Sequence, residues 1–139
     1  MKRLIFWLIT LAVSLAACWT YNPSTMPNEY ASISVPSTLD SPQTITDGQA
    51  IFMTNCAECH GSRGDGQGVA RPAFGPPPAN LTDRAKMSAL SPQYLFWRVS
   101  EGGRVEPYRS QGSIMPAWKY QLSVDERWQV VAYVRTLSR

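Results

Sequence analysis

One stretch of five residues restricts this chain more than any other: Cys56-Ala57-Glu58-Cys59-His60. Its C-x-x-C-H spacing is the pattern that attaches a c-type haem. Two thiols on one helical turn, Cys56 and Cys59, can each form a thioether bond with a vinyl group of the porphyrin. The adjoining imidazole of His60 can then become the proximal ligand of the iron. Because the motif occurs once, the sequence predicts one covalently bound haem c.

The C-x-x-C pair alone would also suit thiol-redox and zinc proteins. A structural zinc ion needs four ligands, but the chain has only one histidine and three cysteines. Cys18 is expected to carry a lipid, as argued below, so too few ligands remain for zinc. A thioredoxin-like site is expected in a βαβ setting, and the sequence shows no alternating strand pattern. The glycine-rich stretch 61–68 lacks the Gly-Lys-Ser/Thr ending of a phosphate-binding loop. Haem attachment is therefore the favoured interpretation.

The N-terminus has the pattern of an export signal. Lys2 and Arg3 precede an apolar run, which ends in Leu15-Ala16-Ala17-Cys18. This predicts a lipoprotein signal peptide over residues 1–17, with cleavage before Cys18 and a lipid on its thiol. The alternative is a retained membrane-spanning anchor, because the apolar run approaches the length of a spanning helix. Both interpretations predict an exported protein that is attached to the periplasmic, outer face of the cytoplasmic membrane.

Residues 18–45 are rich in Pro, Ser, Thr and Asn and have no sustained apolar period. Such a composition buries too little apolar surface to offset its ordering entropy. We predict a lipid-anchored flexible tether, with a strand that lies along a partner as the alternative. Residues 18–139 keep 11 of the 13 basic residues and all 10 acidic ones, a balance of +1. This charge predicts no nucleic-acid partner.

The folded domain is expected over residues 46–139 and should be all-α, with three to five short helices. The predicted helices cover 47–58, about 82–90, 91–101 and 124–137. Ser91-Pro92 is a strong helix start, and Ser123 to Glu126 forms a complete S-x-x-E capping box. The long loops of such a small domain are hard to stabilise by ordinary packing. A buried haem is therefore expected to complete the core.

The second axial ligand must come from another residue type, because His60 is the only histidine. Four methionines remain outside the signal. Met26 lies in the predicted tether, and Met53 shares a helix with the attachment motif and so cannot reach the opposite haem face. Met87 lies on a probable helix, where core packing is the alternative role. Met115 precedes Pro116 in a loop, and we favour it as the axial ligand; Met87 and an open iron remain the alternatives.

These features together resemble class I cytochromes c: a helix that ends in the haem motif, a glycine–proline loop, a middle helix, a Met115-Pro116 loop and a capped last helix. The resemblance covers about 46–139 and implies that the first and last helices cross. Gly48 and Phe52 would then meet Tyr133. It also implies that a proline carbonyl accepts the proton of the His60 ring nitrogen that is not on iron. Pro72 and the run 76–78 both remain candidates.

The resemblance also suggests side chains around the haem. Trp97 and Trp118 are candidate packing residues, with ordinary core aromatics as the equal alternative. Five arginines are expected to be solvated, unless one of them faces a haem propionate: Arg63, Arg71, Arg84, Arg98 and Arg104.

A narrower resemblance comes from the lipoprotein signal together with the stretches 76–83 and 115–118. They are similar to the monohaem subunit of bacterial alternative complex III, a quinol-oxidising membrane complex. This implies a one-electron carrier, not itself an enzyme, with redox partners such as multihaem cytochrome and iron–sulfur subunits. The alternatives are an independent membrane-tethered cytochrome that serves a terminal oxidase or reaction centre, a haem sensor or enzyme with open iron, and a scaffold stabilised by its haem.

Overall fold

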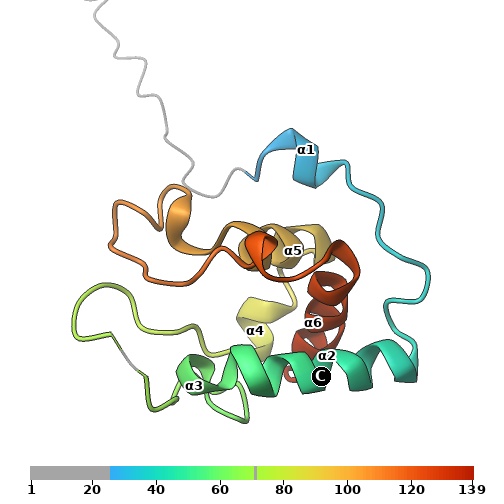
Figure 1. The fold of residues 1–139 in the computed structure, drawn as a ribbon, viewed down its shortest axis with the longest axis horizontal. Helices are drawn as coiled ribbons and strands as arrows, with labels where there is room; N and C mark the ends of the chain where they lie inside the picture. Colours follow the sequence, from blue (N-terminus) through green and yellow to red (C-terminus); the bar gives the residue numbers. More distant parts are fainter. Residues whose placement is uncertain (1–25, 71) are drawn as a thin grey trace, which may run out of the picture.

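The structure is a computed structural model that describes residues 26–70 and 72–139. These residues form helices and loops without a strand, as the sequence predicts: α1 (Asn28–Ala31), α2 (Pro42–Asn55), α3 (Ala57–His60), α4 (Arg84–Met87), α5 (Pro92–Glu101), η1 (Gly102–Arg104), η2 (Trp118–Tyr120) and α6 (Val124–Thr136). Helices α2, α5 and α6 form the body, and the long loops gather at one end of it (Figure 1). The predicted signal, Cys18 and Arg71 lie outside the described residues. No helix within the described part is both long and apolar enough to span a membrane.

Helix α2 begins earlier than the sequence prediction of residue 47. Its N-cap is Ser41, whose side chain accepts a hydrogen bond from the Thr44 amide, and Pro42 occupies the first helical position. Thr46 lies inside the helix, where its hydroxyl donates to the Pro42 carbonyl at 2.9 Å. The helix start is therefore set by Ser41 as N-cap and Pro42 at the first helical position.

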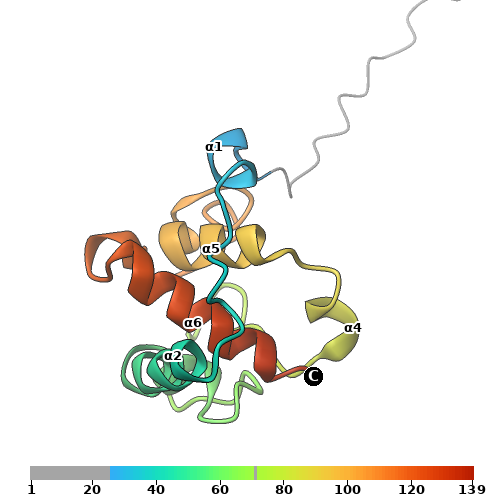
Figure 2. The ribbon, with the colours of Figure 1, turned by 90° about the vertical axis from the view of Figure 1, so that its right-hand side faces the viewer.

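The second half of the predicted tether is packed on the domain. Residues 26–41, here called the N-terminal segment, include the short helix α1 and the side chain of Leu39, which is only 3% exposed. Tyr30, Ile33 and Val35 also pack against the core. Figure 2 shows this segment running from α1 past α5 and α6 to the start of α2. Residues 26–45 therefore pack on the domain although they precede the expected boundary at residue 46, because apolar side chains among them reach the core.

The other helix starts follow local sequence signals. The Asp83 carboxylate accepts from the Lys86 amide and caps α4, and Ser91 caps α5 in the same way through Tyr94. The Ser123–Glu126 capping box is present in both directions at the start of α6. Helix α5 ends at Gly102, whose φ of 57° is in the left-handed region that glycine adopts easily. These predicted starts are confirmed.

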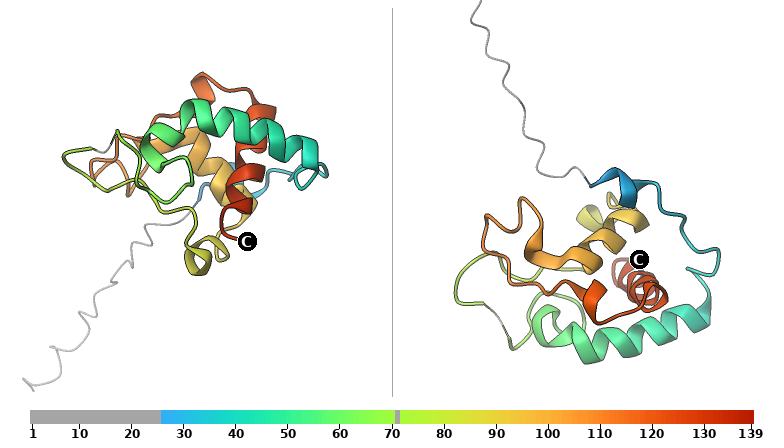
Figure 3. Two further views of the ribbon diagram at one scale, coloured as in Figure 1. Left: turned by 90° about the horizontal axis from the view of Figure 1, so that it is seen from below. Right: turned by 45° about the horizontal axis from the view of Figure 1, so that its top comes forward.

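Helices α2 and α6 cross in close contact, and α6 is seen nearly end-on above α2 in the right panel of Figure 3. Gly48 makes the crossing possible, because a Cβ atom at this position would lie 1.8 Å from the Gln129 carbonyl oxygen. Phe52, one turn later, packs its ring 5.2 Å from that of Tyr133. The predicted contact of the first and last helices is confirmed, and it holds the C-terminal end of α2 in place.

Candidate functional site

The C-x-x-C-H motif lies at the junction of α2 and α3. Cys56 is the C-cap of α2, and its amide still donates to the Phe52 carbonyl at 2.8 Å. The remaining four residues form the single turn α3, which Gly61 ends with a φ of 80°. Both thiols and the imidazole therefore come from consecutive helical turns, as covalent attachment and iron ligation would require.

The glycine loop after the motif folds back against it. The amides of Gly66 and Gly68 donate to the carbonyls of His60 and Cys59, at 2.8 and 3.1 Å. A Cβ atom at Gly68 would lie 2.2 Å from the Glu58 carbonyl oxygen, so only glycine fits this approach. The loop therefore packs closely around the motif.

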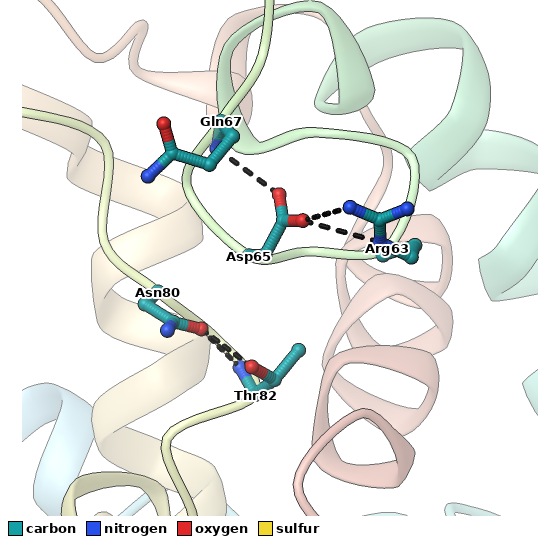
Figure 4. A network of polar contacts seen from close by, with 5 residues as sticks. All are labelled: Arg63, Asp65, Gln67, Asn80 and Thr82. Atoms are coloured by element: carbon teal, nitrogen blue, oxygen red, sulfur yellow. Dashed lines mark hydrogen bonds and ion pairs between the residues drawn. The ribbon is translucent and has the colours of Figure 1, made fainter.

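Short polar contacts hold this loop and the extended stretch of chain that follows it (Figure 4). Asp65 accepts from the Arg63 guanidinium and from the Gln67 amide, and the side-chain oxygen of Asn80 accepts from both the amide and the hydroxyl of Thr82. The Leu81 amide donates to the Gly64 carbonyl at 2.7 Å and joins the two stretches. The backbone at residue 79 is therefore held close to the motif.

The partner of His60 is Ala79. The His60 Nδ1 atom lies 3.1 Å from the Ala79 carbonyl oxygen, and since a carbonyl only accepts, Nδ1 carries the proton. The expectation of a proline carbonyl is wrong: the run Pro76–Pro78 stiffens the approach, and the next residue supplies the acceptor. Burial lowers the pKa of His60 despite this hydrogen bond. The ring is therefore neutral at neutral pH, with Nε2 as the atom that can bind a metal.

The environment of Cys56 does not favour thiolate redox chemistry. Burial, with a smaller contribution from the neighbouring Cys59, raises the pKa of the Cys56 thiol to about 12. Thiol-redox sites depend on a lowered pKa.

Two adjoining cavities, of about 280 and 350 Å³, are lined on one side by the motif. Both are bordered by Cys56, His60 and Met115, so these residues face a common space. Met87 borders the 280 Å³ cavity, whereas Met53 is 46% exposed on the outside of α2. The structure thus brings together three of the predicted site residues around one cavity and adds Cys59 at its second compartment. Met115 and Met87 both remain within the cavity walls.

Polar groups at one side of the cavity suit the carboxylates of a haem. The Arg98 guanidinium lines the cavity, donates to the Gly102 carbonyl at 2.6 Å and lies 3.4 Å from the centre of the Tyr108 ring. No ion pair to it is found within the described part of the chain. Next to it, the indole Nε1 of Trp97 is buried without a hydrogen-bond partner. A half-buried cation in the wall of an apolar cavity, with an orphaned donor on the adjoining Trp97, fits a planar apolar ligand with acidic substituents.

The sequence did not single out all of these groups. Arg98 was one of five candidate arginines, and only the structure distinguishes it; Arg63 is paired with Asp65 at the surface. Tyr94 and Tyr108, whose hydroxyls bond to each other across the cavity wall, carried no sequence signal. Trp118 borders the 350 Å³ cavity beside Cys59, whereas Trp97 packs edge-on against Tyr94. Both tryptophans therefore lie close to the site.

The fold and the site define a helical protein with one covalently bound haem c. The chain matches the family model described as Cytochrome c over residues 45–138, and it belongs to the cytochrome c family. Members of this family carry electrons.

Curated relatives include cbb3-type cytochrome c oxidase subunit FixP of Sinorhizobium medicae, 30% identical over 112 residues, and FixP of Rhizobium meliloti, 29% identical over 135 residues. These alignments cover 76% and 93% of this chain but 36% and 43% of the relatives, so the chain spans less than half their length. A solved structure of the Kuenenia stuttgartiensis reducing HAO-like protein complex superposes with a TM-score of 0.60 at 26% identity, over 77% of this chain and 50% of the other. Cytochrome CL of Methylophaga aminisulfidivorans, at a TM-score of 0.53 and 21% identity over 78% and 65% of the two chains, shares the fold.

Proposed function

We propose that this chain is a one-electron carrier whose single haem c is linked to Cys56 and Cys59, with His60 and Met115 as the axial ligands. The observation that carries the proposal is that His60, oriented by the Ala79 carbonyl, borders the same apolar cavity as Met115. When bound, the haem supplies an iron that cycles between the ferrous and ferric states. The protein residues hold it, orient the imidazole and exclude water.

The surroundings favour a high reduction potential. Histidine–methionine ligation raises the potential relative to more basic ligand pairs. The cavity walls are mainly apolar side chains, and the half-buried Arg98 adds a positive charge nearby. Both features disfavour the additional positive charge of the oxidised iron.

A matched pair of methionine variants tests the ligand assignment. Met115→Ala should abolish the sulfur-to-iron charge-transfer band of the ferric protein and lower its potential. Met87→Ala removes the other methionine of the cavity wall and should retain the band. If Met87→Ala lost the band and Met115→Ala kept it, the assignment would be reversed. If both kept it, another methionine would be the ligand. If the native protein itself lacked the band, the haem would have a different sixth ligand or none, as in the sensor or enzyme alternative.

We also propose that the chain is exported and anchored through a lipid on Cys18. With the N-terminal segment packed on the domain, residues 18–25 span at most about 27 Å between the lipid and the first described residue. This short reach supports a carrier held beside fixed partners over one that swings across long distances. Cys18→Ala should move the protein from the membrane fraction to the soluble periplasmic fraction, and mass spectrometry of the native N-terminal peptide should detect the lipid. A retained anchor would leave Cys18→Ala in the membrane.

The proposed host is a quinol-oxidising complex of the alternative complex III type, supported by the sequence resemblance of stretches 76–83 and 115–118. A second candidate is an oxidase-associated role, which the FixP relatives favour. Affinity purification of the native protein from solubilised membranes separates them. Multihaem and iron–sulfur partners would support the first, and oxidase subunits the second. Recovery of the cytochrome alone would support an independent tethered carrier.

A further inference from the structure

Three side chains from separate parts of the chain meet at the C-terminal end of α5. The Tyr30 hydroxyl donates to Glu101 Oε1 at 2.5 Å, and Lys119 Nζ lies 2.8 Å from each Glu101 oxygen. Tyr30 belongs to the N-terminal segment, Glu101 ends α5 and Lys119 lies in η2. We call these three residues the Glu101 network.

The network is shielded from solvent. The Glu101 side chain is 14% exposed and that of Lys119 31%. Burial acts to raise the pKa of Glu101, but the hydrogen bonds from Lys119 and Tyr30, with Arg127 nearby, outweigh it, so the pKa is lowered. Burial, followed by the contact with Glu101, raises the pKa of Tyr30 to about 12. At neutral pH the carboxylate is therefore charged and accepts from both partners.

The same end of α5 holds the backbone around Met115. Gly102 and Gly103 follow Glu101 directly, and the Gly103 amide donates to the Met115 carbonyl at 2.8 Å. The fit is tight, because a Cβ atom at Gly102 would lie 2.4 Å from the Met115 carbonyl oxygen and 2.1 Å from that of Pro116. Lys119 follows Met115 by four residues, in η2. The loop is thus fastened to α5 both at Met115 and just after it.

We propose that Tyr30 and Glu101 are positioning residues for Met115, so that the N-terminal segment, docked on α5, keeps the Met115 loop closed on the haem. The inference rests on the proposed role of Met115 as axial ligand. Tyr30 touches neither Met115 nor the cavity; it acts through Glu101 and Lys119. The segment that leads to the predicted lipid anchor is thereby linked to the ligand loop, and undocking it loosens the sixth ligand.

Imidazole binding to the full-length ferric protein measures this loosening, because imidazole reaches the iron only after Met115 has left. Tyr30→Phe keeps the ring, which packs near Phe96, and removes only the hydroxyl. It should raise the apparent affinity for imidazole several-fold, up to about tenfold, since one hydrogen bond to a charged group is lost. Glu101→Gln and Lys119→Gln should act in the same direction. In each variant the charge-transfer band should weaken at a lower imidazole concentration than in the native protein.

Asp40→Asn is the matched control. Asp40 ties the N-terminal segment to Arg135 and Arg139 at the other end of α6, far along the chain from η2. This change should leave the imidazole affinity within twofold of the native value. An unchanged affinity in both Tyr30→Phe and Lys119→Gln would overturn the inference, as would an equal rise in Asp40→Asn. Retention of the band in Met115→Ala would instead overturn the ligand assignment, a result visible before any network variant is measured.

Discussion

For the substitution Gly48→Ala, helix propensity predicts a rise in the free energy of unfolding, whereas tertiary packing predicts a fall. Gly48 lies inside α2, where alanine is favoured over glycine by about 1 kcal/mol. The new Cβ atom, however, would lie 1.8 Å from the Gln129 carbonyl oxygen and 3.2 Å from Tyr133 Cβ. The closest atom belongs to the α6 backbone and cannot rotate away, so the two helices must separate.

The expected net effect is destabilising. Overpacking of a tight interior contact costs about 1–3 kcal/mol, and sometimes more. The upper end applies here because the helices must move apart by more than 1 Å to reach ordinary contact, which also separates Phe52 from Tyr133. After the gain in propensity is subtracted, the free energy of unfolding should fall by about 2 kcal/mol.

Denaturant unfolding of the haem-loaded protein measures this change, with haem absorbance and far-UV circular dichroism as two probes. Ala50→Gly, at an exposed position two residues along α2, is the control and should cost about 1 kcal/mol through propensity alone. A Gly48→Ala protein that is as stable as the native one, or more stable, would refute the close crossing of α2 and α6.

Three further predictions concern other parts of the molecule. Arg98→Met should lower the reduction potential by tens of millivolts in a redox titration, because a half-buried positive charge in the cavity wall disfavours the oxidised iron; an unchanged potential would place Arg98 away from the haem. Ser123→Ala removes the α6 cap and should lower the free energy of unfolding by about 1 kcal/mol, a loss that Ser138→Ala should not share. Hydrogen bonding from Arg139 lowers the pKa of Asp40. The unfolded chain therefore takes up this proton at a higher pH than the folded protein, so the stabilisation is complete above the unfolded Asp pKa of about 4 and is lost as the pH falls below it. Thermal unfolding of Asp40→Asn between pH 3 and 7 should accordingly show a weaker acid dependence than the native protein, and an identical profile would contradict the contact.

Features encoded within a few residues could be read from the sequence. The caps at Ser91 and Ser123 are confirmed because each side chain bonds to an amide only three residues away. The start of α2 could have been found in the same way. Ser41-Pro42 carries the same signal as Ser91-Pro92, but the polar composition of the region outweighed it in the prediction.

Features that join distant segments were harder to predict. The N-terminal segment has few apolar residues, and its composition alone predicts disorder. It is ordered because Leu39 and Tyr30 find places on the core that α5 and α6 create. The acceptor for His60 was misassigned for a similar reason: the loop path fixes which carbonyl faces the ring, and that path depends on the contact between Leu81 and Gly64.

The sequence by itself determined the covalent haem and the all-α class, and it predicted Cys56 and Cys59 as the attachment residues and His60 as the proximal ligand. These conclusions rest on a contiguous motif and on local helix signals, where chemistry and spacing are both visible. Only the tertiary structure decided which carbonyl orients His60, which arginine lies at the cavity and how the N-terminal segment reaches the Met115 loop. Each of these depends on groups far apart in the chain, whose meeting is fixed by the packing of α2, α5 and α6.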